Sequence, residues 1–460
     1  MIAKRGPALF FILALAFTVR ALTANFIRAH FNDPSWFQSG SYAVVDSHAQ
    51  AILNREEPLF WINDPARTDR IVYPPGYSLW MALVYKLSGD RSPASIQRVQ
   101  VVLDSLSVWL IVGIGVTAYR WAIGIIAGVL AALSPLLALA GATPNADAPA
   151  SWLVLGATWF LILAARKQRI AYAIASGALL GLACWLRVNP LLLFVVWSIA
   201  IVLYFRMSWR KGAYGGALAL TTVLVISPVV IRNVAVFYPE IAPTGLGVGW
   251  NLLAGIGETE RGAEFDAPCC DAQMIEQDRR AMNLSADTQI GLFFPDGIRR
   301  DRERGRKAVR IIASHPLWYA GVMARRIAGH LKMFGKPAPN VGSAGFNVTS
   351  EKSLSPEHQG KVLGFGVTML GMIQGVYRFL ALPLMLLGIG IAWRRDWRVT
   401  ALVLSMVVYY VFTLAVGHSE IRYGLPMHSV LTLFAGLSLF WIAEFVASRL
   451  RKHQAESEEL

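Results

Sequence analysis

Residues 99–119, VQVVLDSLSVWLIVGIGVTAY, and the segment after Arg120, WAIGIIAGVLAALSPLLALA at 121–140, are each long enough to cross a membrane. A spanning helix needs roughly 20 mostly apolar residues to cross about 30 Å of hydrocarbon. Only helices and closed barrels satisfy their backbone hydrogen bonds in lipid, and these runs are too long for barrel strands. The two segments therefore predict an all-α integral membrane protein.

Runs of the same kind recur along the chain, in which 55% of the 460 residues are hydrophobic. The first run, 7–27, follows Lys4 and Arg5 and lacks the small-residue cleavage pattern of a signal peptide, so we expect it to be a span. The sequence as a whole predicts about ten transmembrane helices. The remaining runs are 149–165, 171–186, 191–205, 213–231, 364–393, 401–416 and 425–446.

Lysine and arginine cluster in alternate gaps between the predicted spans. The clusters lie at Arg120, 166–169, 206–211, 394–398 and 449–452. Short loops rich in these residues face the cytoplasm, so we expect both termini to be cytoplasmic. This topology and an attraction to anionic membrane lipids account for the net charge of +14. No nucleic-acid partner is predicted.

The two long polar segments then face outward, and three regions are expected. They are an N-terminal transmembrane module at 1–232 that includes a first outer loop at 28–97, an outer loop with interfacial helices at 233–361, and a C-terminal transmembrane module with a cytoplasmic tail at 362–460. The segment 308–334 mixes apolar residues with Arg and His, so we place it along the outer interface rather than across the membrane. The basic run 299–307 is either a solvated helix face or a contact for an anionic lipid or glycan.

Carboxylates near the outer boundary are candidates for chemistry, because a charge at a membrane is expensive and usually functional. Asp33 and Asp46 lie in the first outer loop, and Asp147 lies in the turn before the fourth span. Each can cap a helix or act as a general base toward a hydroxyl nucleophile. Asp46 falls in the middle of a predicted amphipathic helix at 41–53, where capping does not explain it.

Cationic side chains gather at the same boundary. Arg187 closes the fifth predicted span, Arg232 closes the seventh, and His418 and Arg422 precede the last. The planar fork of an arginine suits a phosphate group, which it can bind through two hydrogen bonds. Snorkelling toward lipid head groups is the alternative for each arginine taken alone.

An ordered set of short motifs runs through most of the chain. The set consists of Ala49, Ile52 and Leu53, then Tyr73-Pro74-Pro75-Gly76-Tyr77, then 144–148 with its Asp147, then Arg232-Asn233 and Gly249-Trp250-Asn251-Leu252, and finally Arg422-Tyr423-Gly424-Leu425-Pro426. In this order the motifs resemble those of the GT-C class of membrane glycosyltransferases. The resemblance is to bacterial members similar to the protein mannosyltransferases and to the aminoarabinose transferase of lipid A.

The resemblance implies an inverting glycosyltransferase of a bacterial inner membrane, with its active site on the periplasmic face. Such an enzyme moves a sugar from a polyprenyl-phosphate donor to an acceptor that is a lipid, a glycan or a protein. Many relatives carry their acidic residue where this chain has Ser41, so we rank Asp46 above Asp33 as the base. The predicted site comprises the acids Asp46, Asp147 and Asp33, the donor-phosphate ligands Arg422, Arg232, Arg187 and His418, and the substrate-loop residues Tyr73, Pro75, Tyr77 and Asn251.

Neither a nucleotide nor an obligatory metal is predicted. The sequence has no His and Cys cluster with zinc spacing and no Gly-rich phosphate loop. The alternative function is a flippase or transporter of a lipid-linked or anionic substrate. A transporter should carry ionisable groups deep in its spans, whereas the predicted spans are nearly free of charge. The sequence leaves the sugar and the acceptor open.

Overall fold

The structure is a computed structural model that describes residues 6–28, 31, 40–205, 209–331, 361–418 and 420–458. Within these ranges the chain is helical, and its one β feature is an isolated bridge between Gly291 and Phe294. The prediction of an all-α protein is confirmed for this part of the chain.

The long apolar helices form a bundle. They are α1 (Gly6–Arg28), α4 (Pro93–Ala118), α5 (Trp121–Leu133), α6 (Pro135–Ala142), α7 (Asp147–Lys167), α8 (Ile170–Leu186), α9 (Leu193–Tyr204), α10 (Trp209–Phe237), α15 (Lys361–Val416) and α16 (Leu425–Glu458). Each of the ten predicted apolar runs overlaps one or two of these helices, and a run that extends beyond a helix does so by at most two residues.

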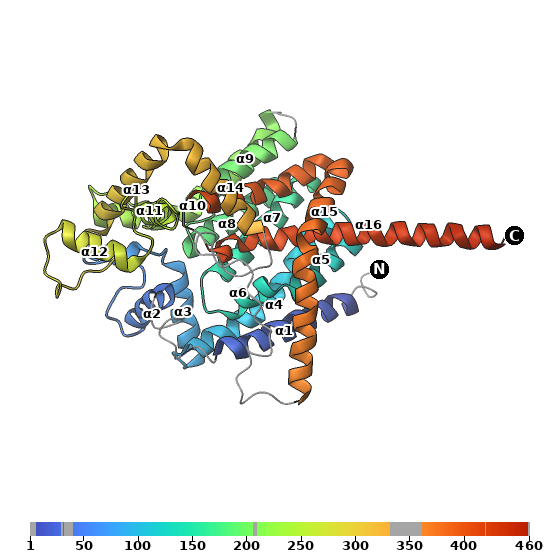
Figure 1. Ribbon diagram of the computed structural model, residues 1–460, viewed down its shortest axis with the longest axis horizontal. Coiled ribbons are helices and arrows are strands. Elements are labelled where there is room, and N and C mark those ends of the chain that lie inside the picture. The colour runs from blue at the N-terminus through green and yellow to red at the C-terminus, as the bar shows by residue number, and fades with distance from the viewer. Residues whose placement is uncertain are drawn as a thin grey trace.

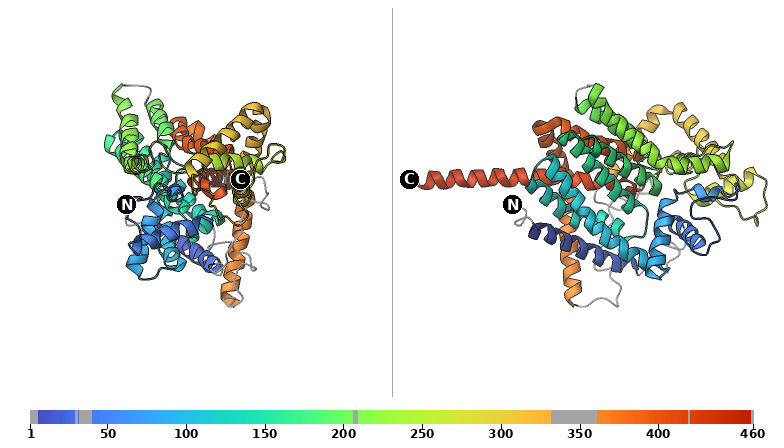
Figure 2. Two further views of the ribbon diagram at one scale, coloured as in Figure 1. Left: turned by 90° about the vertical axis from the view of Figure 1, so that its left-hand side faces the viewer. Right: turned by 180° about the vertical axis from the view of Figure 1, so that it is seen from behind.

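Both termini lie at one end of the bundle, and the shorter helices gather at the other (Figure 1). The view from behind shows the same separation (Figure 2). We call the end away from the termini the distal end. Its helices are α2 (Gly40–Leu53), α3 (Gly76–Ser88), α11 (Val248–Gly257), α12 (Asp271–Ala281), α13 (Gly297–Ser314) and α14 (Pro316–Leu331), with the short turns η1 (Thr68–Ile71) and η4 (Ile421–Gly424).

Small residues let the bundle helices approach one another closely. A Cβ added to Gly115 of α4 would lie 2.7 Å from the Cα of Gly124 in α5. Contacts of this kind favour helix association in lipid, where packing rather than the exclusion of water drives assembly. The buried core of the bundle is correspondingly apolar, and Trp197, Tyr410 and Phe434 are among its largest fully buried side chains.

In the described residues, six helices are long and apolar enough to cross a membrane, or seven if the bent pair α5 and α6 counts as one span. This count is lower than the ten spans expected from the sequence. The helices α8 and α9 are apolar but short. The helix α15 consists of two stretches that meet at a non-helical residue, Asp396.

The run 121–140 was predicted as one span, but it does not form one straight helix. The helices α5 and α6 meet at an angle of 62° around Ser134 and Pro135. Proline has no N–H to donate and clashes with the preceding turn, so it is disfavoured inside a helix and tolerated at the first helical position. The Ser134 hydroxyl accepts a hydrogen bond from Leu137 N and caps the second helix.

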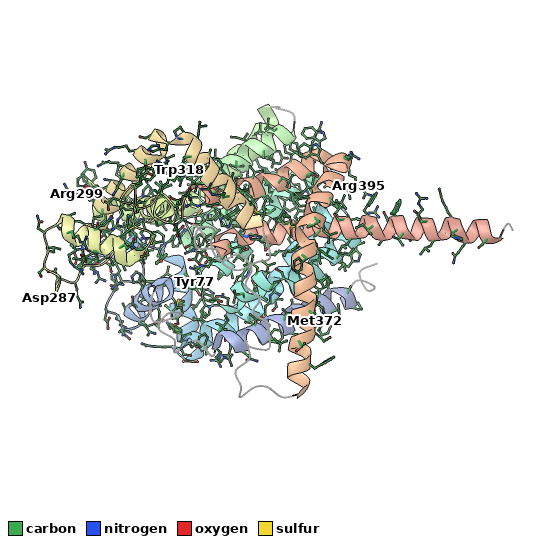
Figure 3. All side chains as sticks on the ribbon, viewed as in Figure 1. Tyr77, Asp287, Arg299, Trp318, Met372 and Arg395 are labelled. Atoms are coloured by element: carbon green, nitrogen blue, oxygen red, sulfur yellow. The ribbon has the colours of Figure 1, made fainter. Side chains whose placement is uncertain are left out.

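Arginines of the basic gaps form ion pairs with acidic residues at the end that carries the termini. Arg120 forms an ion pair of 3.0 Å with Glu444 of α16, and Arg166 forms one of 2.9 Å with Asp396. Figure 3 shows Arg395 near this end, and Asp287 and Arg299 at the distal end. The first half of α15, which carries Met372, stands away from the bundle in Figures 1 and 3.

The segment predicted to lie along an interface forms the end of α13 and the whole of α14, and residues 332–334 fall outside the described part. The helix α14 is too short to count as a candidate span. Within the basic run, Arg300 and Arg304 are buried and pair with Asp278 at 3.0 and 2.5 Å. Much of this run therefore stabilises the distal helices.

Candidate active site

Three of the predicted site residues meet where α7 begins, α8 ends and η4 precedes α16. Asp147, in the first turn of α7, is 6% exposed. The Arg187 Nε lies 2.6 Å from Asp147 Oδ1, and the Arg422 Nε lies 3.6 Å from Asp147 Oδ2. The side chain of Asp147 therefore links two arginines from separate elements. We call Asp147, Arg187 and Arg422 the arginine cluster.

A second carboxylate and an aromatic ring complete the surroundings of the arginine cluster. Glu420 Oε1 accepts a hydrogen bond of 2.6 Å from Arg422. Both guanidinium groups lie over the Tyr423 ring, Arg187 at 4.9 Å and Arg422 at 5.6 Å from its centroid. Arg422 is one-third exposed, and its Nε has no hydrogen-bond partner in the described structure. The Nε itself is buried beside Asp147, whereas the exposed part of the guanidinium is available to an oxygen of a ligand.

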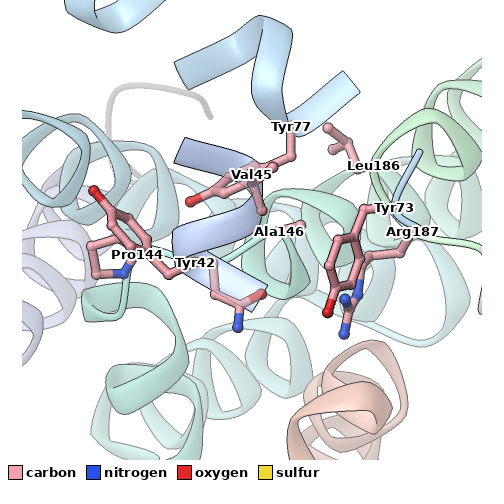
Figure 4. Close-up of a pocket in the computed structure, with 9 residues that line it drawn as sticks. Tyr42, Val45, Tyr73, Tyr77, Pro144, Ala146, Leu186 and Arg187 are labelled. Atoms are coloured by element: carbon pink, nitrogen blue, oxygen red, sulfur yellow. The ribbon is translucent and has the colours of Figure 1, made fainter. Parts of the chain in front are cut away.

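A narrow pocket opens beside the cluster (Figure 4). Its lining is mainly aromatic and aliphatic, with Asn145 and Arg187 among its polar members, and it is formed by Tyr42, Val45, Tyr73, Tyr77, Pro144, Asn145, Ala146, Leu186 and Arg187. Figure 4 shows the Tyr73 ring alongside the Arg187 guanidinium. Burial raises the pKa of Tyr73, although Arg187 and Arg422 partly oppose this effect. Tyr73 therefore offers a protonated hydroxyl next to a cation.

The Pro-Pro-Gly turn brings this loop against the end of α8. Pro75 precedes the first turn of α3. A Cβ on Gly76 would lie 2.6 Å from the carbonyl oxygen of Trp185, so only glycine permits this approach. Tyr77, one residue later, is buried and donates a hydrogen bond of 3.3 Å to Gln100. The turn thus fixes Tyr73 and Tyr77 at the pocket.

Asp46 lies outside the arginine cluster. Its Oδ1 accepts a hydrogen bond of 2.6 Å from the Tyr85 hydroxyl, which lies 3.1 Å from the hydroxyl of Tyr42. Tyr42 also lines the pocket, so Asp46 stands one side chain behind the pocket wall. Burial raises the pKa of Asp46, and the hydrogen bond from Tyr85 only partly opposes this. Asp33 lies outside the described residues.

Arg232 is also separate from the cluster. It is 3% exposed, and its guanidinium donates to Asn233 Oδ1 at 2.7 and 2.9 Å and to the Phe60 carbonyl at 3.2 Å. The Phe60 ring lies 5.0 Å from the guanidinium carbon. Among the described residues Arg232 has no carboxylate partner. Its contacts tie the first long loop to α10.

His418 and Asn251 contact each other rather than the pocket. The backbone N–H of His418 donates to the Asn251 carbonyl at 2.6 Å, and the Asn251 amide donates to Gly247 O at 2.6 Å. The His418 ring bonds to Glu258 through Nδ1. Burial alone would lower the pKa of His418, but this bond and the charge of Glu258 raise it above its usual value. No sequence pattern pointed to Glu258.

One ion pair lies inside the bundle, although the predicted spans looked nearly free of charge. Arg20 of α1 and Asp104 of α4 lie 2.7 Å apart and are almost fully buried. Trp152 of α7 donates to the same carboxylate at 2.6 Å, and Arg20 also donates to the Ala132 carbonyl at 3.1 Å. Both charges are thus neutralised by partners from neighbouring helices, so the pair joins these helices together. Among the described residues no group of three or more His, Cys, Asp or Glu side chains could hold a metal ion.

Residues 72–231, from the turn before α3 to the last turns of α10, match the model of the dolichyl-phosphate-mannose-protein mannosyltransferase family. The chain is also similar to a solved oligosaccharyltransferase of Archaeoglobus fulgidus, crystallised with zinc and sulfate, with a TM-score of 0.52 and 11% identity over 98% of this chain and 51% of that one. The chain therefore spans about half the length of that protein. No curated protein matches the sequence.

Two further solved structures have lower TM-scores. The A. fulgidus oligosaccharyltransferase AglB, solved with an inhibitory peptide and a dolichol-phosphate, has a TM-score of 0.48 at 13% identity, over 98% of this chain and 52% of that one. The transferase ArnT of Cupriavidus metallidurans, bound to undecaprenyl phosphate, has a TM-score of 0.35 at 14% identity, over 94% of this chain and 77% of that one. The resemblance to GT-C membrane glycosyltransferases is confirmed by the family match, and the fold is GT-C-like.

Proposed function

We propose that the protein is an inverting glycosyltransferase that moves a sugar from a polyprenyl-phosphate donor to an acceptor hydroxyl. The observation that supports this most strongly is the arginine cluster. Two arginines from distant parts of the chain converge on one buried carboxylate, beside an aromatic pocket and at the end of an apolar bundle. In this proposal the lipid tail enters sideways from the bilayer and the phosphate binds at the arginine cluster.

In the proposed reaction the acceptor oxygen attacks the anomeric carbon and the bond from that carbon to the phosphate oxygen breaks. The polyprenyl phosphate leaves as an anion, and Arg187 and Arg422 stabilise the charge that develops on it. The Arg422 side chain is one-third exposed, so the exposed part of its guanidinium can bind a phosphate oxygen. Asp147 holds the two arginines together before the donor arrives.

The acceptor proton passes to a carboxylate in this proposal. Asp46 remains our first candidate, because burial raises its pKa toward the range of a working base and Tyr85 fixes its orientation. A base must come within hydrogen-bond reach of the acceptor hydroxyl, and contacts of this kind often tighten only when substrate binds. The acceptor would then lie beside α2, the helix that carries both Tyr42 and Asp46. Asp33 and Asp147 are the other candidates.

The remaining predicted ligands receive supporting roles in this proposal. Tyr73 and Tyr77 line the donor pocket, and Pro75 shapes the loop that carries them. Arg232 remains a candidate phosphate ligand of lower rank, because its donors are already bonded to Asn233 and Phe60.

We also propose ten membrane crossings, with both termini in the cytoplasm of a bacterial inner membrane and the distal end outside. The ion pairs that Arg120 and Arg166 form near the termini support this orientation, because short basic loops stay on the cytoplasmic side. A cysteine at exposed Asn63 should react with an impermeant maleimide added to intact cells. Cysteines at exposed Gln168 and Arg395 should react only after the cells are opened. Labelling of Gln168 from outside would contradict the topology.

Deletion of the gene tests the function in the cell. The donor should accumulate as an intact polyprenyl-phosphate sugar, because its consumer is missing, and mass spectrometry of extracted lipids measures it. Expression of the parental protein should remove the excess, and so should the control Arg325→Lys, whose ion pair with Glu260 is exposed. An unchanged pool of lipid-linked sugars, with the protein shown to be expressed in the parent strain, would contradict the proposal.

A further inference from the structure

The end of α15, which leads toward Arg422, is held by side chains of α14. The last carbonyls of a helix have no partner within the helix itself. Here the Val416 carbonyl accepts a hydrogen bond from the Tyr319 hydroxyl, and the Ala415 carbonyl accepts one of 3.3 Å from Arg326. Arg326 is 3% exposed and also donates to the Gly255 carbonyl in α11. One buried guanidinium therefore joins α11, α14 and the end of α15.

The helix α11 holds the next two residues. His418 N donates to Asn251 O, and its ring bonds to Glu258. A Cβ on Gly255 would lie 2.5 Å from His418 N and 2.6 Å from the Gly417 carbonyl carbon. The backbone at 417–418 is therefore pressed against α11 and pinned there by both the main chain and the side chain of His418.

These contacts affect Arg422 because they hold the backbone that ends four residues before it. The contact of Arg422 with Asp147 is long, at 3.6 Å, and its firmest bond is to Glu420, two residues away on the same segment. These contacts alone do not fix the segment relative to the pocket. The position of the Arg422 guanidinium therefore depends on where the backbone at 415–418 is held, and an error of about 1 Å in a reacting group costs on the order of a hundredfold in rate.

We propose that Glu258 and Arg326 are positioning residues for Arg422. Glu258 acts through the His418 ring and Arg326 through the carbonyls at the end of α15, so that the α11–α14 unit places Arg422 at the donor phosphate. This inference rests on the proposed function. It gives the large loop at the distal end an indirect role in donor binding, because no residue of α11 or α14 lines the pocket beside the arginine cluster.

A neighbouring ion pair provides a matched control. Glu260 and Arg325 lie 3.1 Å apart and join the segment after α11 to α14, but both are more than half exposed. Neither is bonded to residues 415–418 in the described structure. If the contacts of Glu258 serve only to hold the loop together, Glu258→Gln and Glu260→Gln should both leave donor binding intact.

The test uses the full-length protein in nanodiscs, with undecaprenyl phosphate as the binding probe and a polyprenyl-phosphate sugar as the donor. Glu258→Gln should weaken probe binding and raise the donor KM by about tenfold or more, with a smaller change in kcat. Glu260→Gln should match the parental protein, and Glu258→Asp should recover part of the loss. In an Arg422→Lys background, Glu258→Gln should add little, because both changes act on the same contact.

The outcomes separate this inference from the proposed function. Parental binding and KM for Glu258→Gln, with or without a lower melting temperature, would overturn the positioning role while leaving the transferase intact. A parental protein that neither binds the probe nor turns over donor would overturn both. If Glu258→Gln does not insert, Gly255→Ala tests the same contact, because its new methyl group displaces 417–418. The result expected for it is the same rise in donor KM.

Discussion

Replacement of Arg422 by lysine should remove most sugar transfer. A lysine keeps the positive charge but loses the planar fork, so its ammonium cannot hold Glu420 and a phosphate in the fixed geometry that a guanidinium provides. A hydrogen bond between charged groups contributes about 1.5–3 kcal/mol, so we expect kcat/KM to fall by about 10- to 100-fold. Binding of the probe undecaprenyl phosphate to the protein should weaken in parallel.

Two lysine variants serve as controls for Arg422→Lys. Arg325→Lys, at an exposed ion pair, should have parental activity. Arg232→Lys should be less severe than Arg422→Lys, because Arg232 bonds to Asn233 and Phe60 and lies apart from the cluster. If Arg422→Lys is as active as the parent, then only its charge matters and phosphate binding by its fork is excluded.

Asp46→Asn should fold and insert but transfer sugar at least about a hundredfold more slowly, as expected for loss of a positioned general base. The base acts only when ionised, and burial raises the pKa of Asp46. The rate should therefore fall as the pH drops through a value above the usual aspartate pKa of about 3.9. Steady-state kinetics across a pH series measures both effects, and Asp46→Asn should lose the acidic limb of the profile.

The other two acids are the comparison for Asp46. Asp33→Asn should have a smaller effect. Asp147→Asn leaves Arg187 without its 2.6 Å partner in a buried place, so it should also lower thermal stability. Parental activity for Asp46→Asn, together with an inactive Asp33→Asn or Asp147→Asn, would show that the general base is a residue other than Asp46. Parental activity in all three variants would remove the main support for an enzyme.

The sequence predicted the face of the membrane on which the site residues lie better than it predicted their contacts. The alternation of basic gaps placed Asp147, Arg187 and Arg422 at one boundary, and the structure brings these three together. Arg232 was assigned to the same boundary, yet it lies apart. The charge of the loops indicates at which face of the membrane a residue lies, whereas its position within that face depends on how the helices pack.

Other features depended on contacts between residues far apart in the chain. The ion pair of Arg20 with Asp104 joins α1 to α4, and no sequence pattern around either residue predicts the other as its partner. The same holds for Glu258 and His418. By contrast, a local signal marks the bend between α5 and α6, because Ser134-Pro135 is a helix-start signal, although 121–140 was predicted as one span. Local signals can therefore mark such boundaries, whereas long-range pairs required the structure.

The most direct test of the proposed transferase is sugar release by the purified protein. The full chain in nanodiscs is supplied with a labelled polyprenyl-phosphate sugar and a set of candidate acceptors, with no second compartment. We predict that labelled sugar is released or transferred by the parental protein and that Arg422→Lys lowers the rate by about 10- to 100-fold. A transporter has no turnover to show in this assay. Well-folded parental protein that leaves every donor intact would contradict the account and favour transport of a lipid-linked substrate.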